Sequence, residues 1–200
     1  MTTVFQRYTG DEISNHSIQM TQRVLETSTH QFPIDVLALR FEQYLSAPSS
    51  VHEKYPWAAR FVMGFPVSSW QRQLVWNAGQ KARFITAVWS GVSLGSYLTN
   101  DWCGSAAEHM AMAENSEILI DGQQRLYSLE QYFLDQLAVP DAHGMPRVWS
   151  EIGNSERKRF LSTIFAHSSV SSGDEMALRK TYDLYTQGLA PRTHDQRAAQ

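Results

Sequence analysis

Residues 116–129 read SEILIDGQQRLYSL, and this stretch decides the fold that we expect for the chain. Ile118–Ile120 is a short apolar block without helical spacing, which is typical of a buried strand. Asp121 and Gly122 then favour a sharp turn, because glycine reverses direction without a steric penalty. Apolar residues at helical spacing follow and predict one buried helix face, made by Leu126, Leu129, Phe133 and Leu137. The stretch therefore predicts a strand, a glycine turn and a helix.

The start of this helix is a candidate anion site. Gln123, Gln124 and Arg125 fall in or beside its first turn, where free backbone N–H groups and the helix dipole attract negative charge. The planar, permanently charged guanidinium of Arg125 suits a phosphate group. The plainer alternative is an ordinary tight turn in which Arg125 is a surface charge, and the spacing by itself favours that alternative.

A second stretch, PVSSWQRQLVW over residues 66–76, has no regular period and is expected to be a loop. Its Gln71-Arg72 pair repeats the amide and guanidinium of Gln124-Arg125. Two such pairs that converge would form a forked donor site for phosphate oxygens. The alternative is that Trp70 and Trp76 anchor the loop in the core while Arg72 reaches solvent.

Composition bounds the class of protein. The 200 residues are 42% hydrophobic with a net charge of −3, which predicts a folded chain and gives no support for non-specific binding to nucleic acid. Cys103 is the one cysteine of the sequence, which excludes an intrachain disulfide and a cysteine zinc cluster. The first 30 residues hold no signal-like apolar core, and no run approaches 18 apolar residues. We expect a soluble, cytoplasmic protein without a membrane partner.

The predicted fold class is α/β (α+β), with a small mixed sheet, surrounding helices and a helical C-terminal part. The sheet is expected from the regions of Arg60, Ser116 and Arg147. Helices are predicted over Ile34–Leu45, Asn77–Ser90 with Asn77 as the N-cap, Glu156–His167 and Glu175–Tyr185. Ala106–Ala113 is either a helix or a flexible insertion. The expected organisation is an N-terminal arm over 1–31, a single domain over 32–192 and a tail over 193–200.

Three runs in this order resemble a known family. They are the Pro66–Trp76 run, the Ile120–Leu129 run with its Asp-Gly-Gln-Gln-Arg pentapeptide, and the late Leu184–His194 run. Together they resemble the Asp-Gly-Gln-Gln-Arg family of the ParB/sulfiredoxin-like superfamily, of which the N-terminal domain of the restriction enzyme GmrSD is an example. The resemblance covers roughly Val62 to Arg197. Departures from the family pattern are Trp70 for Tyr, Tyr127 and Ser128 for two Thr, and Thr186 and Leu189 in the last segment.

The resemblance implies a ParB-like fold and a nucleotide site. Asp121 and Arg125 would be catalytic, and Asp121 would hold Mg²⁺ or position water. Nucleotide binding would fall to the residues of the two motifs, which are Gln71, Arg72, Gly122, Gln123, Gln124 and Ser128. The cofactors would be Mg²⁺ and a nucleoside triphosphate (NTP), because phosphoryl transfer needs a metal-holding carboxylate and cationic donors on the oxygens.

Three functions remain open at this point. The first is a nucleotide-binding, NTP-hydrolysing domain of a DNA-directed system such as restriction, defence or phage DNA processing, with DNA and a separate nuclease chain as partners. The second is a DNA-acting enzyme, either a ParB-like nuclease or a phosphotransferase on modified bases, which clustering of Arg60, Arg72, Arg83 and Arg125 would favour. The third is a catalytically silent regulatory protein, which an Asp121 carboxylate facing away from Arg125 would favour.

Overall fold

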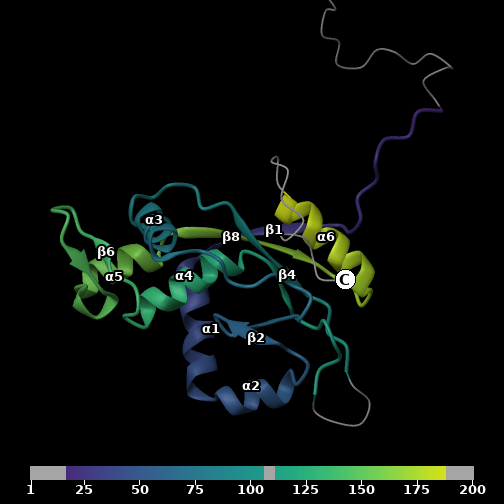
Figure 1. The fold of residues 1–200 in the computed structure, drawn as a ribbon, viewed down its shortest axis with the longest axis horizontal. Coiled ribbons are helices and arrows are strands. Elements are labelled where there is room, and N and C mark those ends of the chain that lie inside the picture. The colour runs from purple at the N-terminus through teal and green to yellow at the C-terminus, as the bar shows by residue number, and fades with distance from the viewer. Residues whose placement is uncertain (1–16, 106–110, 188–200) are drawn as a thin grey trace, which may run out of the picture.

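The computed structural model describes residues 17–105 and 111–187, and its centre is a mixed sheet of four strands in the order β1-β8-β4-β5 (Figure 1). The elements are, in chain order, β1 (Ser28–Pro33), α1 (Ile34–Ser46), α2 (Pro48–Lys54), β2 (Arg60–Val62), β3 (Phe65–Val67), α3 (Ala78–Trp89), β4 (Ser96–Asn100), β5 (Leu119–Asp121), α4 (Gln123–Phe133), β6 (Val139–Pro140), β7 (Pro146–Arg147), η2 (Trp149–Glu151), α5 (Asn154–Leu161), β8 (Ile164–Val170) and α6 (Glu175–Gln187). The α+β class with a small mixed sheet is confirmed.

The sheet joins segments that lie far apart in the sequence. β1 runs antiparallel to β8, with Ser28 opposite Ser169, and β4 runs parallel to β8, with Ser96 opposite Ala166. β5 completes the sheet antiparallel to β4, and the register shifts at Leu98. The strand that leads into the glycine turn is therefore an edge strand, and the turn lies at the end of the sheet.

Successive side chains of a strand point to opposite faces of the sheet, and the two faces pack into different cores. Tyr97 in β4 and Leu119 in β5 pack against the helices α1, α3, α4 and α5 and the β2–β3 hairpin on one face. Their neighbours Leu98 and Ile120 pack against α6 on the other face, together with Trp70. Figure 1 shows α6 on one side of the sheet and the remaining helices on the other side. The sheet thus separates a large core from a small one.

Local sequence signals account for the helices that were predicted. α1 places Ile34, Leu37 and Phe41 in the core, as their spacing predicts. α3 begins after Asn77, whose side chain accepts from the Gln80 N–H in a capping box. These two helices and α6 confirm the predicted ranges to within one or two residues.

The predicted composition of the sheet is partly wrong. Arg60 belongs to a separate hairpin of β2 and β3, in which Met63 and Gly64 form a two-residue turn with positive φ at both residues. The Arg147 region contributes β7, which pairs with β6 alone. Of the three regions expected to form the sheet, the one that begins at Ser116 enters it, as β5.

The helix predicted over 156–167 is also wrong in its second half. α5 ends at Leu161, and the next residues form β8, which lies between β1 and β4 in the sheet. Phe160, Ile164 and Phe165 fit a helical spacing, but Phe165 faces the core from a strand. The N-terminal arm predicted over 1–31 includes the first residues of β1.

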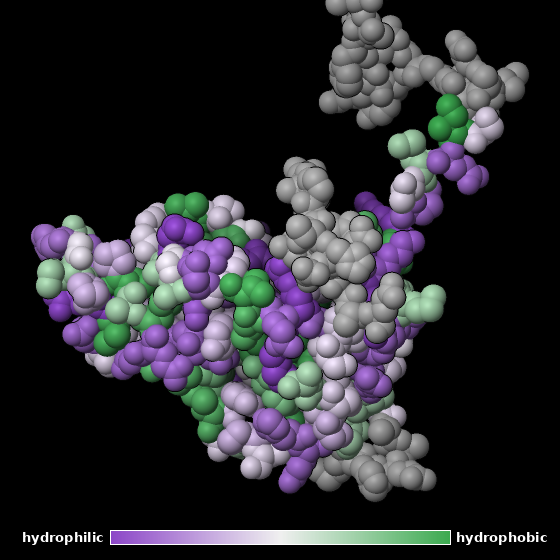
Figure 2. All heavy atoms as spheres, in the orientation of Figure 1, coloured by the Kyte–Doolittle hydropathy of each residue, from purple (hydrophilic) through white to green (hydrophobic). Residues whose placement is uncertain are grey.

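Some expectations lie outside the described residues, namely most of the segment 106–113, the first half of the arm and the 193–200 tail. Within the described ranges, no helix is both long enough and apolar enough to cross a membrane. Figure 2 shows the face seen in Figure 1, where hydrophilic and hydrophobic residues are interspersed. This is the surface expected when most large apolar side chains have entered a core.

Candidate functional site

The predicted strand, glycine turn and helix are present and are fixed by close packing. β5 ends at Asp121, and Gly122 follows as the N-cap of α4 with φ +96°, a conformation that L side chains rarely adopt. A Cβ atom on Gly122 would lie 2.7 Å from Cβ of Tyr97 in β4. Glycine is therefore required here both by the backbone conformation and by the neighbouring strand.

Asp121 and Arg125 face each other across this turn. Arg125 Nη2 donates to Asp121 Oδ2 at 2.7 Å, and the two side chains are 22% and 20% exposed. Arg125 Nη1 also donates to the carbonyl oxygen of Leu94 at 3.1 Å. The guanidinium is thus held at the mouth of the turn by a half-buried, charge-assisted bond.

The amides of Gln123 and Gln124 are engaged in holding the 66–76 loop. Gln123 Nε2 donates to the carbonyl oxygen of Arg72 at 3.0 Å, and Gln123 Oε1 accepts from Arg60 Nη2. Gln124 Nε2 donates to the carbonyl oxygen of Gln73 at 3.1 Å. Its Oε1 accepts from the backbone N–H groups of residues 75 and 76, both at 3.1 Å. Both side chains are buried, and they act here as an internal clamp on the loop.

Gln71 and Arg72 approach the turn from this loop, as the motif predicts. Gln71 Nε2 donates to the carbonyl oxygen of Leu119 at 2.7 Å. The backbone N–H of Arg72 donates to the hydroxyl of Tyr182 in α6 at 3.3 Å. Within the described ranges, Gln71 Oε1 and Arg72 Nε are buried and have no hydrogen-bond partner. Of the two atoms, Arg72 Nε is a donor, whose bonding an anion or water can complete.

A cavity of about 210 Å³ lies at the N-terminus of α4 between the loop and α6. Its lining residues are Arg72, Trp76, Ile120, Asp121, Gly122, Gln123, Gln124, Arg125, Tyr182, Tyr185 and Thr186. Six of the eight predicted site residues are among them. Gln71 and Ser128 are not, and the Ser128 hydroxyl is buried and donates to the carbonyl oxygen of Gln124 within the helix.

The electrostatics of this cavity favour an anion. Two guanidinium groups, from Arg72 and Arg125, line it together with the first turn of α4, whose N–H groups lack intrahelical partners. Arg60 is a third guanidinium close to the loop, although it is not among the lining residues. Burial lowers the pKa of Arg60 from its usual value, and the nearby Tyr182 acts in the opposite direction. Arg60 donates to the carbonyl oxygen of Arg72 and so helps to hold the 66–76 loop in place.

The donor atoms at this site suit Mg²⁺ only if the ligand supplies most of them. In the part of the chain that the structure describes, no group of three or more His, Cys, Asp or Glu residues could hold a metal ion. Asp121 is the carboxylate that lines the cavity, and one of its oxygens accepts from Arg125. Mg²⁺ commonly binds through one carboxylate together with substrate phosphates and water, so Asp121 fits that mode.

Two parts of this site were not identified from the sequence. Tyr182 and Tyr185 come from α6, where the sequence shows them as members of an apolar helix face. Trp76 packs against the large core, as the loop-anchor alternative predicts, and it also lines the cavity. The available signal is the pair of tyrosines one turn apart, because a phenolic hydroxyl on a core-facing position needs a polar partner.

Comparison with protein families gives one result for this chain. The family described as "GmrSD restriction endonuclease, N-terminal domain" matches residues 61–198, which is more than half of the chain. The match includes the loop, the glycine turn and α6, but not β1 or α1. Searches of curated proteins and of solved structures gave no significant match.

Proposed function

The chain belongs to the GmrSD restriction endonuclease N-terminal domain family, and from this premise we propose that it is the nucleotide-handling part of a DNA restriction system. It binds a nucleoside triphosphate with its phosphates in the α4 cavity and hydrolyses it when Mg²⁺ is present. DNA and a nuclease chain are its partners in this proposal. A ParB-like nucleotide site and its Mg²⁺ belong to the same proposal.

One observation carries the proposal: Arg72 and Arg125, from segments about 50 residues apart, line one cavity at a helix N-terminus. Phosphate oxygens between them would accept from two guanidinium groups and from the backbone N–H groups of the first turn of α4. Arg72 Nε, which is buried without a partner among the described residues, would gain one. The cavity thus has hydrogen-bond donors for which the described residues provide no acceptor, and an anion would provide one.

The residues divide into two roles under this proposal. Arg72 and Arg125 hold phosphate oxygens, and Asp121 holds the metal or orients the attacking water. The amides of Gln71, Gln123 and Gln124 keep the loop and the turn in register, because their donor groups are already bonded to backbone carbonyls. Mg²⁺, when bound, would neutralise the charge that develops on the transferring phosphoryl group.

The two other functions gain less support from the geometry. Asp121 faces Arg125, which is the opposite of the arrangement expected for a silent site. Arg60 is used internally on the loop and Arg72 lines the cavity, so the guanidinium groups do not form an open basic face there. A DNA-acting active site would require such a face.

The decisive experiment measures binding and Mg²⁺-dependent hydrolysis of each NTP by the purified chain, with and without DNA. Arg72→Lys and Asp121→Asn are the test variants, because they keep size while removing the planar fork and the carboxylate charge. Arg83→Lys is the matched control on the exposed side of α3. We expect both test variants to lower turnover at least tenfold and the control to leave it unchanged. Absence of NTP binding by the wild-type chain would overturn the proposal.

A further inference from the structure

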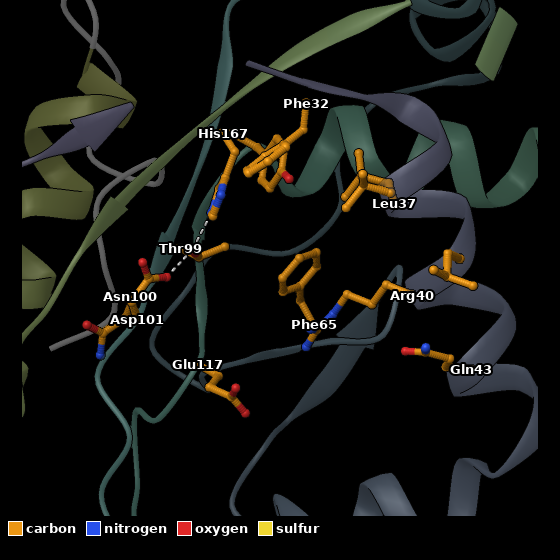
Figure 3. Close-up of a pocket in the computed structure, with 13 residues that line it drawn as sticks. Phe32, Leu37, Arg40, Gln43, Phe65, Thr99, Asn100, Asp101, Glu117 and His167 are labelled. Atoms are coloured by element: carbon orange, nitrogen blue, oxygen red, sulfur yellow. Dashed lines mark hydrogen bonds between the residues drawn. The ribbon is translucent and has the colours of Figure 1, made fainter. Parts of the chain in front are cut away.

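A second cavity, of about 480 Å³, lies between α1 and the β4–β8 pair and shares no lining residue with the α4 cavity. Figure 3 shows Arg40 and Leu37 reaching into it from α1, with Thr99 and His167 opposite them and Phe65 on its floor. Its volume is within the range of sites for small organic ligands. α1 precedes the family match, so part of this cavity is built from residues that the match does not cover.

Arg40 brings into this cavity a positive charge that forms no ion pair among the described residues. Its guanidinium lies over the ring of Phe65, 3.8 Å from the centroid, and Nη2 donates to the carbonyl oxygen of Gly64 at 3.2 Å. Nε is buried and has no partner, and within the described ranges no carboxylate forms an ion pair with Arg40. Burial lowers the pKa of Arg40 from its usual value, while Glu117 on the cavity wall acts in the opposite direction. Because Glu117 forms its ion pair with Lys54, Arg40 has donor groups left for a further anionic partner.

Flat rings form the upper wall of the cavity. Tyr97 and His167 are stacked with centroids 4.7 Å apart and planes at 18°. Phe32 lies 5.9 Å from His167, and its side chain is partly exposed at the entrance. Tyr97 is 3% exposed and backs the His167 ring, so the rings that a planar ligand can reach on this wall are those of His167 and Phe32.

The same side of the cavity presents hydrogen-bond acceptors beside these rings. The Thr99 hydroxyl donates to Asp101 Oδ1 at 3.1 Å and also lies 2.7 Å from His167 Nε2 (Figure 3). Because that hydroxyl has one proton and gives it to Asp101, His167 Nε2 must carry a proton and donate it to Thr99. The neutral imidazole then has Nδ1 as an acceptor. Glu117 adds a carboxylate, whose Oε2 accepts from Tyr55 and Lys54 at the rim.

We propose that this cavity binds a mononucleotide, with its planar base against the His167 ring and its phosphate on Arg40. The base must carry an exocyclic amino group, because the groups at its end of the cavity are acceptors, whereas uracil has a single N3–H between two carbonyl acceptors. Adenine, guanine and cytosine have an exocyclic amino group that meets this requirement. The site is distinct from the α4 cavity, and its ligand is a nucleoside monophosphate rather than the triphosphate of the proposed hydrolysis.

Three features of the ligand can be tested separately. Calorimetric titration of the full chain with AMP, GMP, CMP and UMP tests which base is bound. Titration with adenosine, which lacks the phosphate, tests the need for the phosphate. Titration with inorganic phosphate, which lacks the base, tests the need for the planar ring. We expect AMP, GMP or CMP to bind at least tenfold more tightly than UMP, adenosine or inorganic phosphate. Equal affinity for inorganic phosphate and the mononucleotides would overturn the proposal, because the cavity would then be a simple anion site.

Single substitutions test whether the mononucleotide binds in this cavity or in the α4 cavity. Arg40→Met keeps the length of the side chain and removes its charge, and Phe32→Ser removes an exposed ring without entering the core. We expect each to weaken the binding at least tenfold, while Arg72→Lys at the α4 cavity leaves it unchanged. If Arg40→Met fails to fold, as its circular dichroism would show, Phe32→Ser still tests the site. Loss of binding in Arg72→Lys, unchanged binding in Phe32→Ser, or no mononucleotide binding to the wild-type chain would overturn the proposal.

Discussion

Arg125 donates to Asp121 at 2.7 Å across the turn from β5 to α4, so two predicted site residues are bonded directly to each other. The pair orients both groups toward the cavity and fixes the distance between a carboxylate and a guanidinium. A metal or phosphate that enters the cavity meets this arrangement preformed. Pre-organised charges of this kind need little rearrangement when the ligand binds.

We expect Arg125→Ala to lower the free energy of unfolding by about 2 kcal/mol, because it breaks a half-buried charged bond and leaves the Leu94 carbonyl unpaired. Urea unfolding followed by tryptophan fluorescence measures this loss. Arg23→Ala is the control, because the Arg23–Glu26 pair is about 80% exposed and should contribute well under ~1 kcal/mol. Equal losses in the two variants would contradict a structural role for the Asp121–Arg125 pair.

Gln124→Ala should lower the free energy of unfolding by about 2–3 kcal/mol, since the buried amide makes three hydrogen bonds to the 66–76 loop. Gln73→Ala is the matched control, because Gln73 contributes its backbone carbonyl and its side chain is exposed. Urea unfolding again gives the measurement. An unaffected Gln124→Ala would mean that the loop is held in place without this clamp.

Gly122→Ala should be more damaging than Gly91→Ala, although both glycines have positive φ. Nothing lies within 4 Å of a Cβ atom at Gly91, whereas at Gly122 the new atom meets Tyr97 at 2.7 Å. We expect a loss of about 1 kcal/mol at Gly91 and about 3 kcal/mol at Gly122, where strain adds to the cost of the backbone conformation. Thermal unfolding of the two variants compares them, and similar losses would exclude close packing of the turn on β4.

The His167 side chain should make the protein less stable at acidic pH. Burial lowers its pKa from 6.5, while Asp101 acts in the opposite direction and His30 and Arg40 act with burial. Below about pH 6.5 the His167 imidazole binds a proton more readily in the unfolded chain than in the folded chain. The free energy of unfolding therefore falls as the pH decreases.

Urea unfolding between pH 5 and 7.5 measures this slope, which has a limit of about 1.4 kcal/mol per pH unit for one proton. His167→Phe should have a smaller slope than the wild-type chain. His143→Phe deletes a histidine at an exposed turn and should retain the wild-type slope. An unchanged slope in His167→Phe would contradict the prediction.

The local elements near the glycine turn could be predicted because their signals are contained in short segments. The apolar block of β5, the glycine and the leucines of α4 lie within about 15 residues, and the capping box of α3 spans four. β8 could not be predicted in this way. Its residues His167, Ser168 and Ser169 are polar yet face partners in neighbouring strands, so the strand lacks an apolar alternation.

The candidate site was predictable in its residues but not in their bonding. The two motifs name six residues that line the α4 cavity, whereas the use of Gln71, Gln123 and Gln124 as clamps depends on backbone atoms about 50 residues away in sequence. The second cavity, which Arg40 lines, had a weaker signal in the sequence. Arg40 is a charged residue three positions after Leu37 and next to Phe41 on a buried helix face, a position where an unpaired charge is unusual.

The order of the strands also has a consequence for how the chain acquires its fold during synthesis. β1 is made early and pairs with β8, so that Ser28 lies opposite Ser169 and Thr29 contacts Ser168, which comes 139 positions later in the chain. β4 likewise waits for β8 before it has both neighbours. Contacts of such long sequence separation form slowly, because a large loop must close first. The central sheet therefore assembles only after β8 has left the ribosome, and until then β1 and β4 each present an open edge to other chains.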